Sequence, residues 1–308
     1  MEGDCIELRS SSTLRGNHGI LRVPPRFTGN VIGSTTTNDT RRDTPPYKHW
    51  DPQWKRARYI YDVNIIKPET NGLHYLAPGE PCTGNGIYLS CDGNSEVRFM
   101  WGVLMYGIRI SGSFTNGIRV VNYDLPTGPE DNAWNHDMRI EAVIECCETA
   151  VNLTNCNGPR LAVTVQPHCA SDEKTPYAKQ GVRLEDCKFV DMSSAAIWDW
   201  NATNSLFGEN KEYTSVAMYG DCSGLILYDY AYYRTSFDVR ERIYADPVTN
   251  LERMVVVQEP ITKWFKPIEG KPYFNSGLID EPLLLKSSFD NCFDLKEMPV
   301  FTEQLSIA

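Results

Sequence analysis

Alternation of apolar and polar residues is the main structural signal along this chain, and it recurs in short segments. Period-2 alternation in Arg139-Ile140-Glu141 and Arg183-Leu184-Glu185 places the middle residue in a core and its charged neighbours outside. Segments of this kind follow one another at intervals of 21, 20, 21 and 23 residues: Arg98-Phe99, Arg119-Val120, Arg139-Ile140, Arg160-Leu161 and Arg183-Leu184. Such a repeat fits a chain that winds once per repeat and lays each strand against the previous turn. The pattern predicts an all-β fold, a parallel β-solenoid with about 21 residues per turn.

A second series of strands is predicted about half a turn out of phase with the arginine series. Gly86-Ile87 and Gly107-Ile108 are 21 residues apart, and we interpret them as equivalent strands of one further sheet. Each turn of the solenoid is therefore expected to contribute to two sheets.

The extent of the alternation predicts how the chain is divided. Residues 1–33 form the first turn or turns, residues 34–58 a polar inserted loop, and residues 59–230 the main solenoid. The proline-rich residues 231–308 show no repeat and are interpreted as a small irregular C-terminal element that caps the solenoid or mediates oligomerisation. Since solenoid ends are normally capped, we expect the chain to be a fragment of a longer protein, or a partner to cover its first turn.

Charge and hydropathy exclude two classes of partner. The 308 residues carry a formal net charge of −10, which repels polyanions and argues against sequence-independent nucleic-acid binding. No run of about 18 apolar residues occurs, so membrane insertion is not expected.

Residue types that bind metals or cofactors are present without the usual spacing. The 10 cysteines form no Cys-x-x-Cys pair and the 5 histidines are scattered, so no metal site is expected. No glycine-rich phosphate loop with a following lysine is found, and we expect no cofactor.

Carboxylates and arginines of the repeats are candidates for carbohydrate chemistry. Glycoside cleavage needs two carboxyl groups about 5 to 9.5 Å apart. Glu141 and Glu185, expected two rungs apart at roughly 9.6 Å, lie at the limit for an inverting pair. Alternatively, both glutamates neutralise a ladder of Arg139, Arg160 and Arg183. The same arginines suit the carboxylate of an anionic sugar, or they are simply solvated.

Two tryptophan-containing segments are further candidates. In the loop before Met138, Trp134 is a possible stacking platform for a sugar, with His136 or Asp137 in proton transfer; alternatively the loop is a turn closed by its Asn and Asp side chains. The segment Trp198-Asp199-Trp200 offers two indoles to a sugar or a neighbouring subunit. Its aspartate, also a candidate acid, would point inward unless the chain bends there.

The stretches "NGIRVVNYD", "DMRIEAVIECCETAVNLTNC" and "GVRLEDCKFVDMSSAAIWDW" resemble the right-handed parallel β-helix proteins grouped as pectin-lyase-like, and bacteriophage tailspike and tail-appendage proteins most of all. The likeness covers roughly residues 5 to 230 and is a pattern of turns. It implies a right-handed β-helix in a homotrimeric virion protein that binds, and often cleaves, a host surface polysaccharide. The motifs typical of polygalacturonases are not matched by Arg139-Ile140-Glu141 or Gly16-Asn17-His18-Gly19.

Three functions are compatible with these sequence features. The leading hypothesis is a tailspike-like virion protein, made in the host cytoplasm, that contacts host polysaccharide as a homotrimer or beside other virion subunits. Binding is favoured over catalysis because no carboxylate pair stands out. The alternatives are a polysaccharide hydrolase or lyase that uses Glu141, Glu185, Asp137 or Asp199, and a purely structural virion component.

Overall fold

A computed structural model describes the strand-forming part of the chain. The described residues are 4–8, 12–35, 58–68, 76, 79–90, 102–122, 138–167, 178–192, 194–197, 213–222, 225–229, 243–245 and 255–258. They form 19 strands and no helix, and the strands make up an 8-stranded and an 11-stranded sheet. This confirms the predicted all-β class.

The strands of the two sheets have the following bounds. The 8-stranded sheet contains β1 (Asp4–Glu7), β4 (Asn30–Thr35), β7 (Asn85–Ser90), β9 (Asn116–Val121), β11 (Thr149–Thr154), β13 (Gln180–Glu185), β16 (Thr214–Tyr219) and β18 (Ile243–Ala245). The 11-stranded sheet contains β2 (Ser12–Arg15), β3 (Ile20–Arg22), β5 (Arg58–Tyr61), β6 (Asn64–Lys67), β8 (Val103–Gly112), β10 (Arg139–Glu145), β12 (Arg160–Gln166), β14 (Asp191–Met192), β15 (Ala196–Ile197), β17 (Ile226–Asp229) and β19 (Val255–Gln258).

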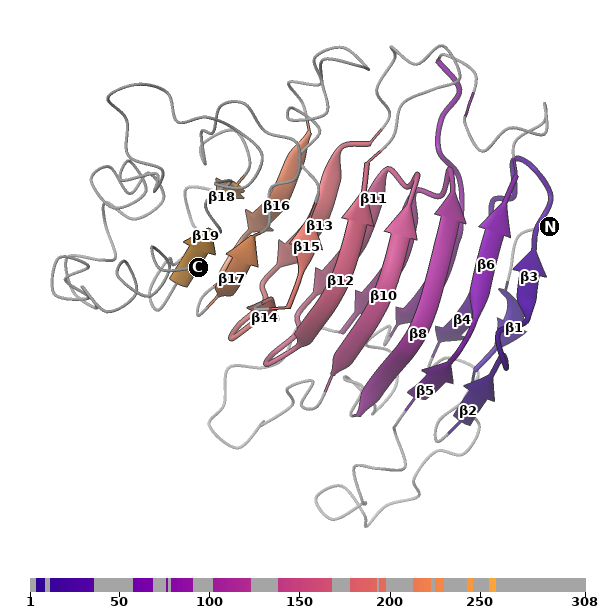
Figure 1. Ribbon diagram of the computed structural model, residues 1–308, viewed down its shortest axis with the longest axis horizontal. Helices are drawn as coiled ribbons and strands as arrows, with labels where there is room; N and C mark the ends of the chain where they lie inside the picture. The colour runs from indigo at the N-terminus through magenta and orange to yellow at the C-terminus, as the bar shows by residue number, and fades with distance from the viewer. Residues whose placement is uncertain are drawn as a thin grey trace, which may run out of the picture.

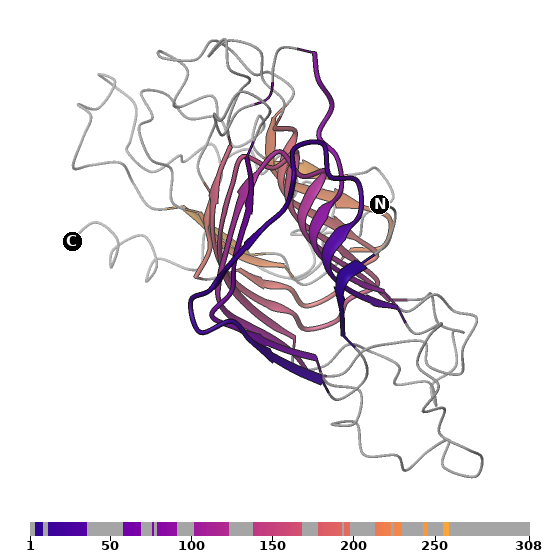
Figure 2. The same ribbon diagram turned by 90° about the vertical axis from the view of Figure 1, so that its right-hand side faces the viewer.

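The chain alternates between the two sheets and returns to each in the same direction. Within each sheet the strands follow chain order, and neighbouring strands are parallel. Figure 1 shows the strands stacked along the long axis, from β1–β3 at one end to β18 and β19 at the other. Turned by 90°, the sheets appear as two walls that face each other (Figure 2). This arrangement is compatible with a parallel β-helix.

Rows of aliphatic side chains fill the space between the sheets. Ile6, Ile32, Ile87 and Ile118 lie on successive strands in register, and the last three have no exposed surface. In the other sheet, Ile60, Met105, Ile140 and Leu161 form the corresponding row. Ile140 and Leu184 are both 1% exposed, which confirms the prediction that these residues point into the core.

The strand register corrects the predicted turn of about 21 residues. Asn85, Asn116, Thr149, Gln180 and Thr214 are aligned, so successive turns contain 31, 33, 31 and 34 residues. The same register pairs Ile87 with Ile118, so the predicted equivalence of Gly86-Ile87 and Gly107-Ile108 is wrong.

The spacing misled because the two sheets carry the same arginine-apolar pattern. Arg119 and Arg183 belong to the 8-stranded sheet, whereas Arg139 and Arg160 are neighbours in the 11-stranded sheet. Arg98 lies outside the described residues. The intervals from Arg119 to Arg139 and from Arg160 to Arg183 therefore run from one sheet to the other, whereas the interval from Arg139 to Arg160 stays within the 11-stranded sheet.

Strands pair across two of the predicted segment boundaries. β4 pairs directly with β7 and β2 with β5, so the described residues before position 34 stack on the turns that follow the predicted loop. Most of the predicted loop, residues 36–57, lies outside the described residues. Past residue 230, β18 pairs with β16 and β19 with β17, so two strands of the predicted C-terminal element extend the stack.

Candidate functional site

The outer face of the 11-stranded sheet carries two adjacent arginines, called here the arginine pair. Arg139 of β10 and Arg160 of β12 are direct register partners and both are exposed. Among the described residues, neither forms an ion pair. Like charges on neighbouring strands destabilise a sheet, by about 1 kcal/mol at this spacing in water. An anion placed between the two side chains would relieve this repulsion.

Three tyrosines, called here the tyrosine stack, lie on the same face beside the arginine pair. The rings of Tyr61 and Tyr106 are parallel to within 5° with centroids 6.0 Å apart, and Tyr59 lies 6.4 Å from Tyr61. Tyr59 and Arg139 are both register partners of Leu104, so aromatic, apolar and cationic side chains follow one another in one strip across β5, β8, β10 and β12. The sequence-based prediction missed these tyrosines, although the alternation Tyr59-Ile60-Tyr61 is the signal that could have revealed them.

A β-bulge brings Glu141 beside this strip. The register between β8 and β10 shifts between Ile140 and Ala142, so Glu141 lies opposite both Tyr106 and Gly107. Gly107 is exposed with φ +64°, and a Cβ there would lie 2.6 Å from Asp62 Oδ1. Gly107, which has no side chain, thus lies between Asp62 and Glu141. These two residues are two strands apart, which corresponds to about 9.6 Å by ideal sheet spacing. Asp62 was not among the candidates that the sequence suggested.

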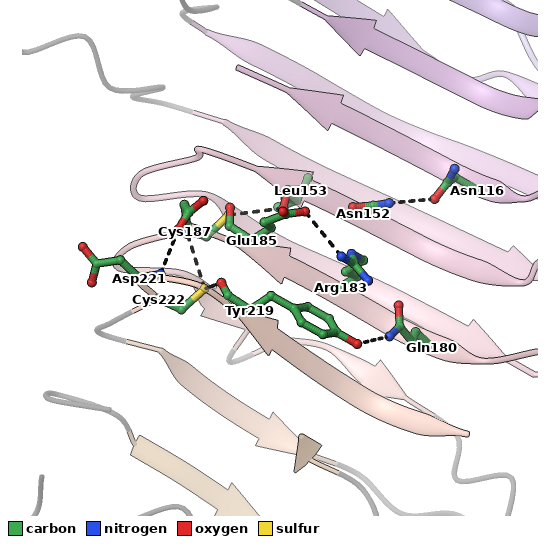
Figure 3. A network of polar contacts seen from close by, with 11 residues as sticks. Asn116, Asn152, Leu153, Gln180, Arg183, Glu185, Cys187, Tyr219, Asp221 and Cys222 are labelled. Carbon is green, nitrogen blue, oxygen red and sulfur yellow. Dashed lines mark hydrogen bonds and ion pairs between the residues drawn. The ribbon is translucent and has the colours of Figure 1, made fainter. Parts of the chain in front are cut away.

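Arg183 and Glu185 lie in the 8-stranded sheet instead, within the polar network of Figure 3. Arg183 Nη2 lies 3.4 Å from Glu185 Oε2, and its guanidinium is 4.0 Å from the centroid of the Tyr219 ring. Gln180 Nε2 donates a hydrogen bond of 2.8 Å to the Tyr219 hydroxyl. Glu185 thus lies beside a single arginine of its own strand and not beside a ladder of Arg139, Arg160 and Arg183, and a partly exposed pair of this kind contributes at most about 1 kcal/mol.

The predicted Glu141 and Glu185 pair loses its geometric basis. The two glutamates belong to different sheets, because the turn is longer than the arginine spacing suggested. The expected separation of two rungs along one face therefore does not apply to them. Likewise, Arg183 does not stack on Arg139 and Arg160.

The remaining predicted site residues cannot be placed. Trp134, His136, Asp137, Trp198, Asp199 and Trp200 all lie outside the described residues.

Cysteines stack at one corner of the 8-stranded sheet and are held as thiols. Cys156, Cys187 and Cys222 are free and buried, and the Cys187 amide donates to Cys222 Sγ at 3.4 Å. Burial, reinforced by the Cys187 thiol, raises the pKa of Cys222 to about 12, and burial also raises the pKa of Cys187. Neutral thiols of this kind are poor nucleophiles, so we assign these cysteines to packing.

Membrane-spanning helices and metal-binding clusters are both missing from the described residues. This part of the chain contains no helix long and apolar enough to cross a bilayer. Nor do His, Cys, Asp and Glu side chains come together there in a group of three that could hold a metal ion.

Comparison with known proteins does not assign the chain. No protein-family model matches it, and no curated protein or solved structure does. Function therefore has to be inferred from the two sheet faces themselves.

Proposed function

We propose that the chain is a right-handed parallel β-helix protein of bacteriophage tailspike type that binds a host surface polysaccharide. The observation that carries this proposal is the strip on the 11-stranded sheet, in which the tyrosine stack continues into Arg139 and Arg160, two cations without an ion pair in the described part of the chain. Aromatic rings offer rigid apolar contact area with a polar edge, and two guanidinium groups suit carboxylate or phosphate substituents of a glycan. The ligand expected on this face is an anionic polysaccharide.

Binding to purified surface polysaccharide, measured by surface plasmon resonance, tests this proposal. Arg139→Gln with Arg160→Gln removes both charges without burying a new group, because both side chains are exposed. We expect the affinity of this double variant to fall about tenfold or more, as charge-assisted hydrogen bonds contribute about 1.5 to 3 kcal/mol.

Arg109→Gln is the matched control, since Arg109 lies in the same sheet but is already 3.3 Å from a carboxylate oxygen of Glu145. It should bind like the parent protein. Equal affinity of the double variant and the parent protein would contradict polysaccharide binding by this face. The alternative would then be that the protein is a purely structural virion component.

Cleavage of the bound polysaccharide is a second candidate, favoured by the carboxylates of Asp62 and Glu141 on either side of Gly107. Their ideal separation of about 9.6 Å is at the upper end for an inverting hydrolase, and the Asp62 carboxylate leans over Gly107 toward Glu141. Release of reducing ends on incubation with polysaccharide, lost in Glu141→Gln and retained in Glu185→Gln, would support this function. If the parent protein released no reducing ends, the cleavage proposal would be contradicted and only the binding proposal would stand.

Assembly into a homotrimer is part of the tailspike proposal. Light scattering coupled to size exclusion should then give a mass of about three times 34.9 kDa. A monomeric mass would contradict the trimer without affecting the binding test.

A further inference from the structure

A second polar row lies on the outer face of the opposite, 8-stranded sheet. Tyr88, Arg119, Asn152 and Arg183 are register partners on β7, β9, β11 and β13. The residues on either side of each of them along the strand belong to the buried core, for example Ile118 and Val120 beside Arg119. Alternation therefore directs this row away from the core.

The two arginines of the row lean away from each other. The Arg119 guanidinium lies 5.5 Å from the Tyr88 ring centroid, on the strand before it, whereas Arg183 lies 4.0 Å from the Tyr219 ring, on the strand after it. Asn152 stands between them on the middle strand, and Figure 3 shows its side chain directed toward Asn116, to which it donates a hydrogen bond of 2.9 Å. Two guanidinium groups thus flank one amide.

Two polar atoms in the centre of this row have no partner among the described residues. Asn152 is only 9% exposed, and its Oδ1 accepts no hydrogen bond from that part of the chain. Arg119 Nε, on the register partner of Asn152, is also buried and donates none to any described residue. Buried donors and acceptors are nearly always satisfied in folded proteins, so an ordered water or a polar group of a ligand would complete the hydrogen bonds of this pair.

We infer that Arg119 and Asn152 form a binding site for a saccharide that carries a carboxylate, separate from the arginine pair and beside Arg183, whose guanidinium is already held by Glu185 and Tyr219. A planar carboxylate matches the two-donor edge of a guanidinium, and Arg119 has no competing ion pair among the described residues. A sugar hydroxyl is the donor that Asn152 Oδ1 lacks. Because stacking on Tyr88 is a weak contact, Arg119 swings outward to meet the ligand and uncovers the amide.

Titration calorimetry of the full chain with a short alginate oligosaccharide tests this inference. The matched ligand is the same oligosaccharide with its carboxyl groups reduced to alcohols. We expect the acidic form to bind and the reduced form to bind at least about tenfold more weakly. Arg119→Gln should weaken binding about tenfold, and Arg119→Lys should weaken it too, because lysine keeps the charge but lacks the planar fork and Nε. Arg183→Gln should have a smaller effect, because Glu185 already neutralises this guanidinium.

Variants on the other sheet separate this site from the proposed function. Arg109→Gln, at an arginine of the 11-stranded sheet that is already paired with Glu145, should bind the oligosaccharide like the parent protein. Arg119→Gln should weaken binding further when it is added to the double variant Arg139→Gln with Arg160→Gln, and unchanged thermal unfolding of every variant is the check on folding. Absence of binding by the parent, equal binding of the reduced sugar, or unchanged affinity in Arg119→Gln would each overturn the inference. So would a loss confined to the double variant on the 11-stranded sheet, or equal competition by an acidic peptide.

Discussion

At the scale of single residues, Lys67 is the least expected core member, since a lysine side chain with 1% exposure joins several turns of the stack. Its Nζ donates to the carbonyl oxygens of Thr83 (2.7 Å), Ser113 (3.1 Å) and Phe27 (3.3 Å), and to the Thr83 hydroxyl (2.7 Å). The ammonium is stable there because it replaces its water shell with protein oxygens.

Lys67→Met should therefore destabilise the protein by about 2 to 3 kcal/mol, because the Thr83 carbonyl loses its lysine donor, whereas the Ser113 and Phe27 carbonyls keep hydrogen bonds from the Thr83 amide and hydroxyl. Urea unfolding measures the change. Lys179→Met is the control: its side chain is 59% exposed and paired with Glu148, so a loss below about 1 kcal/mol is expected. Equal losses in both variants would show that the Lys67 contacts are not structural.

Gly112 illustrates how closely the backbones of successive turns approach. Its φ is +134°, and an added Cβ would lie 2.5 Å from the Lys67 carbonyl oxygen, a backbone atom that cannot move aside cheaply. Gly158 has a similar positive φ of +68° but open space around the missing Cβ.

Gly112→Ala should consequently cost about 3 kcal/mol or more, against about 1 to 2 kcal/mol for Gly158→Ala, which has only the conformational penalty. The difference between their free energies of unfolding measures the steric contact together with the less accessible backbone conformation of Gly112. Indistinguishable values would mean that the turns separate easily at this point.

At the scale of elements, one corner of the 8-stranded sheet is built alike in three turns. Asn155, Asp186 and Gly220 all adopt positive φ, and each precedes a buried cysteine by one or two residues. A short polar residue or glycine tolerates this backbone, and the cysteine sulfur then meets the chain of the neighbouring turn, as where Cys222 Sγ accepts from the Cys187 amide.

The thiols of this corner predict how stability depends on pH. The pKa of Cys222 is raised from 9.0 to about 12, so folding favours the neutral thiol. Its contribution is complete below about pH 9, where the unfolded thiol is also neutral, and is lost as the pH rises toward 12.

We therefore expect the free energy of unfolding to fall above about pH 9, and to fall less steeply in Cys222→Ala. Urea unfolding at several pH values measures both slopes. Parallel slopes for the variant and the parent would contradict burial of this thiol.

These same corners contain the signal that would have yielded the correct register. Asn155-Cys156 and Asp186-Cys187 are 31 residues apart, and so are Asn85-Gly86-Ile87 and Asn116-Gly117-Ile118. Both intervals equal the observed turn. The corner residues require a left-handed backbone that recurs once per turn, and Asn85 and Asn116, at the starts of β7 and β9, are hydrogen-bonded to each other from turn to turn. Arginine beside an apolar residue requires only an exposed strand, and both sheets supply such strands.

At the scale of the whole molecule, stability should depend on position along the stack. Each turn contacts only its neighbours, so an interior side chain packs against two turns and a terminal one against a single turn. Ile6 and Ile87 occupy the same row, but Ile6 lies on the edge strand β1 and is only partly buried, whereas Ile87 has no exposed surface.

Ile87→Ala should cost about 2 to 5 kcal/mol and Ile6→Ala less than half as much. Ile20→Ala, at a side chain 62% exposed, should change stability by less than about 0.5 kcal/mol. Denaturant unfolding of the three variants checks the order. A loss at Ile6 as large as that at Ile87 would indicate that the first strand is covered as completely as the interior.

The sequence alone predicted that the chain forms parallel strands and that Ile140 and Leu184 point into the core. It could do so because side-chain alternation along a strand has a period of two residues. The length of a turn, the sheet to which each arginine belongs and the neighbours of Glu141 emerged only from the folded chain. These features depend on which strands become neighbours, and the segments between strands differ in length. Hydrogen bonding between the strands therefore defines their register, whereas spacing along the chain does not.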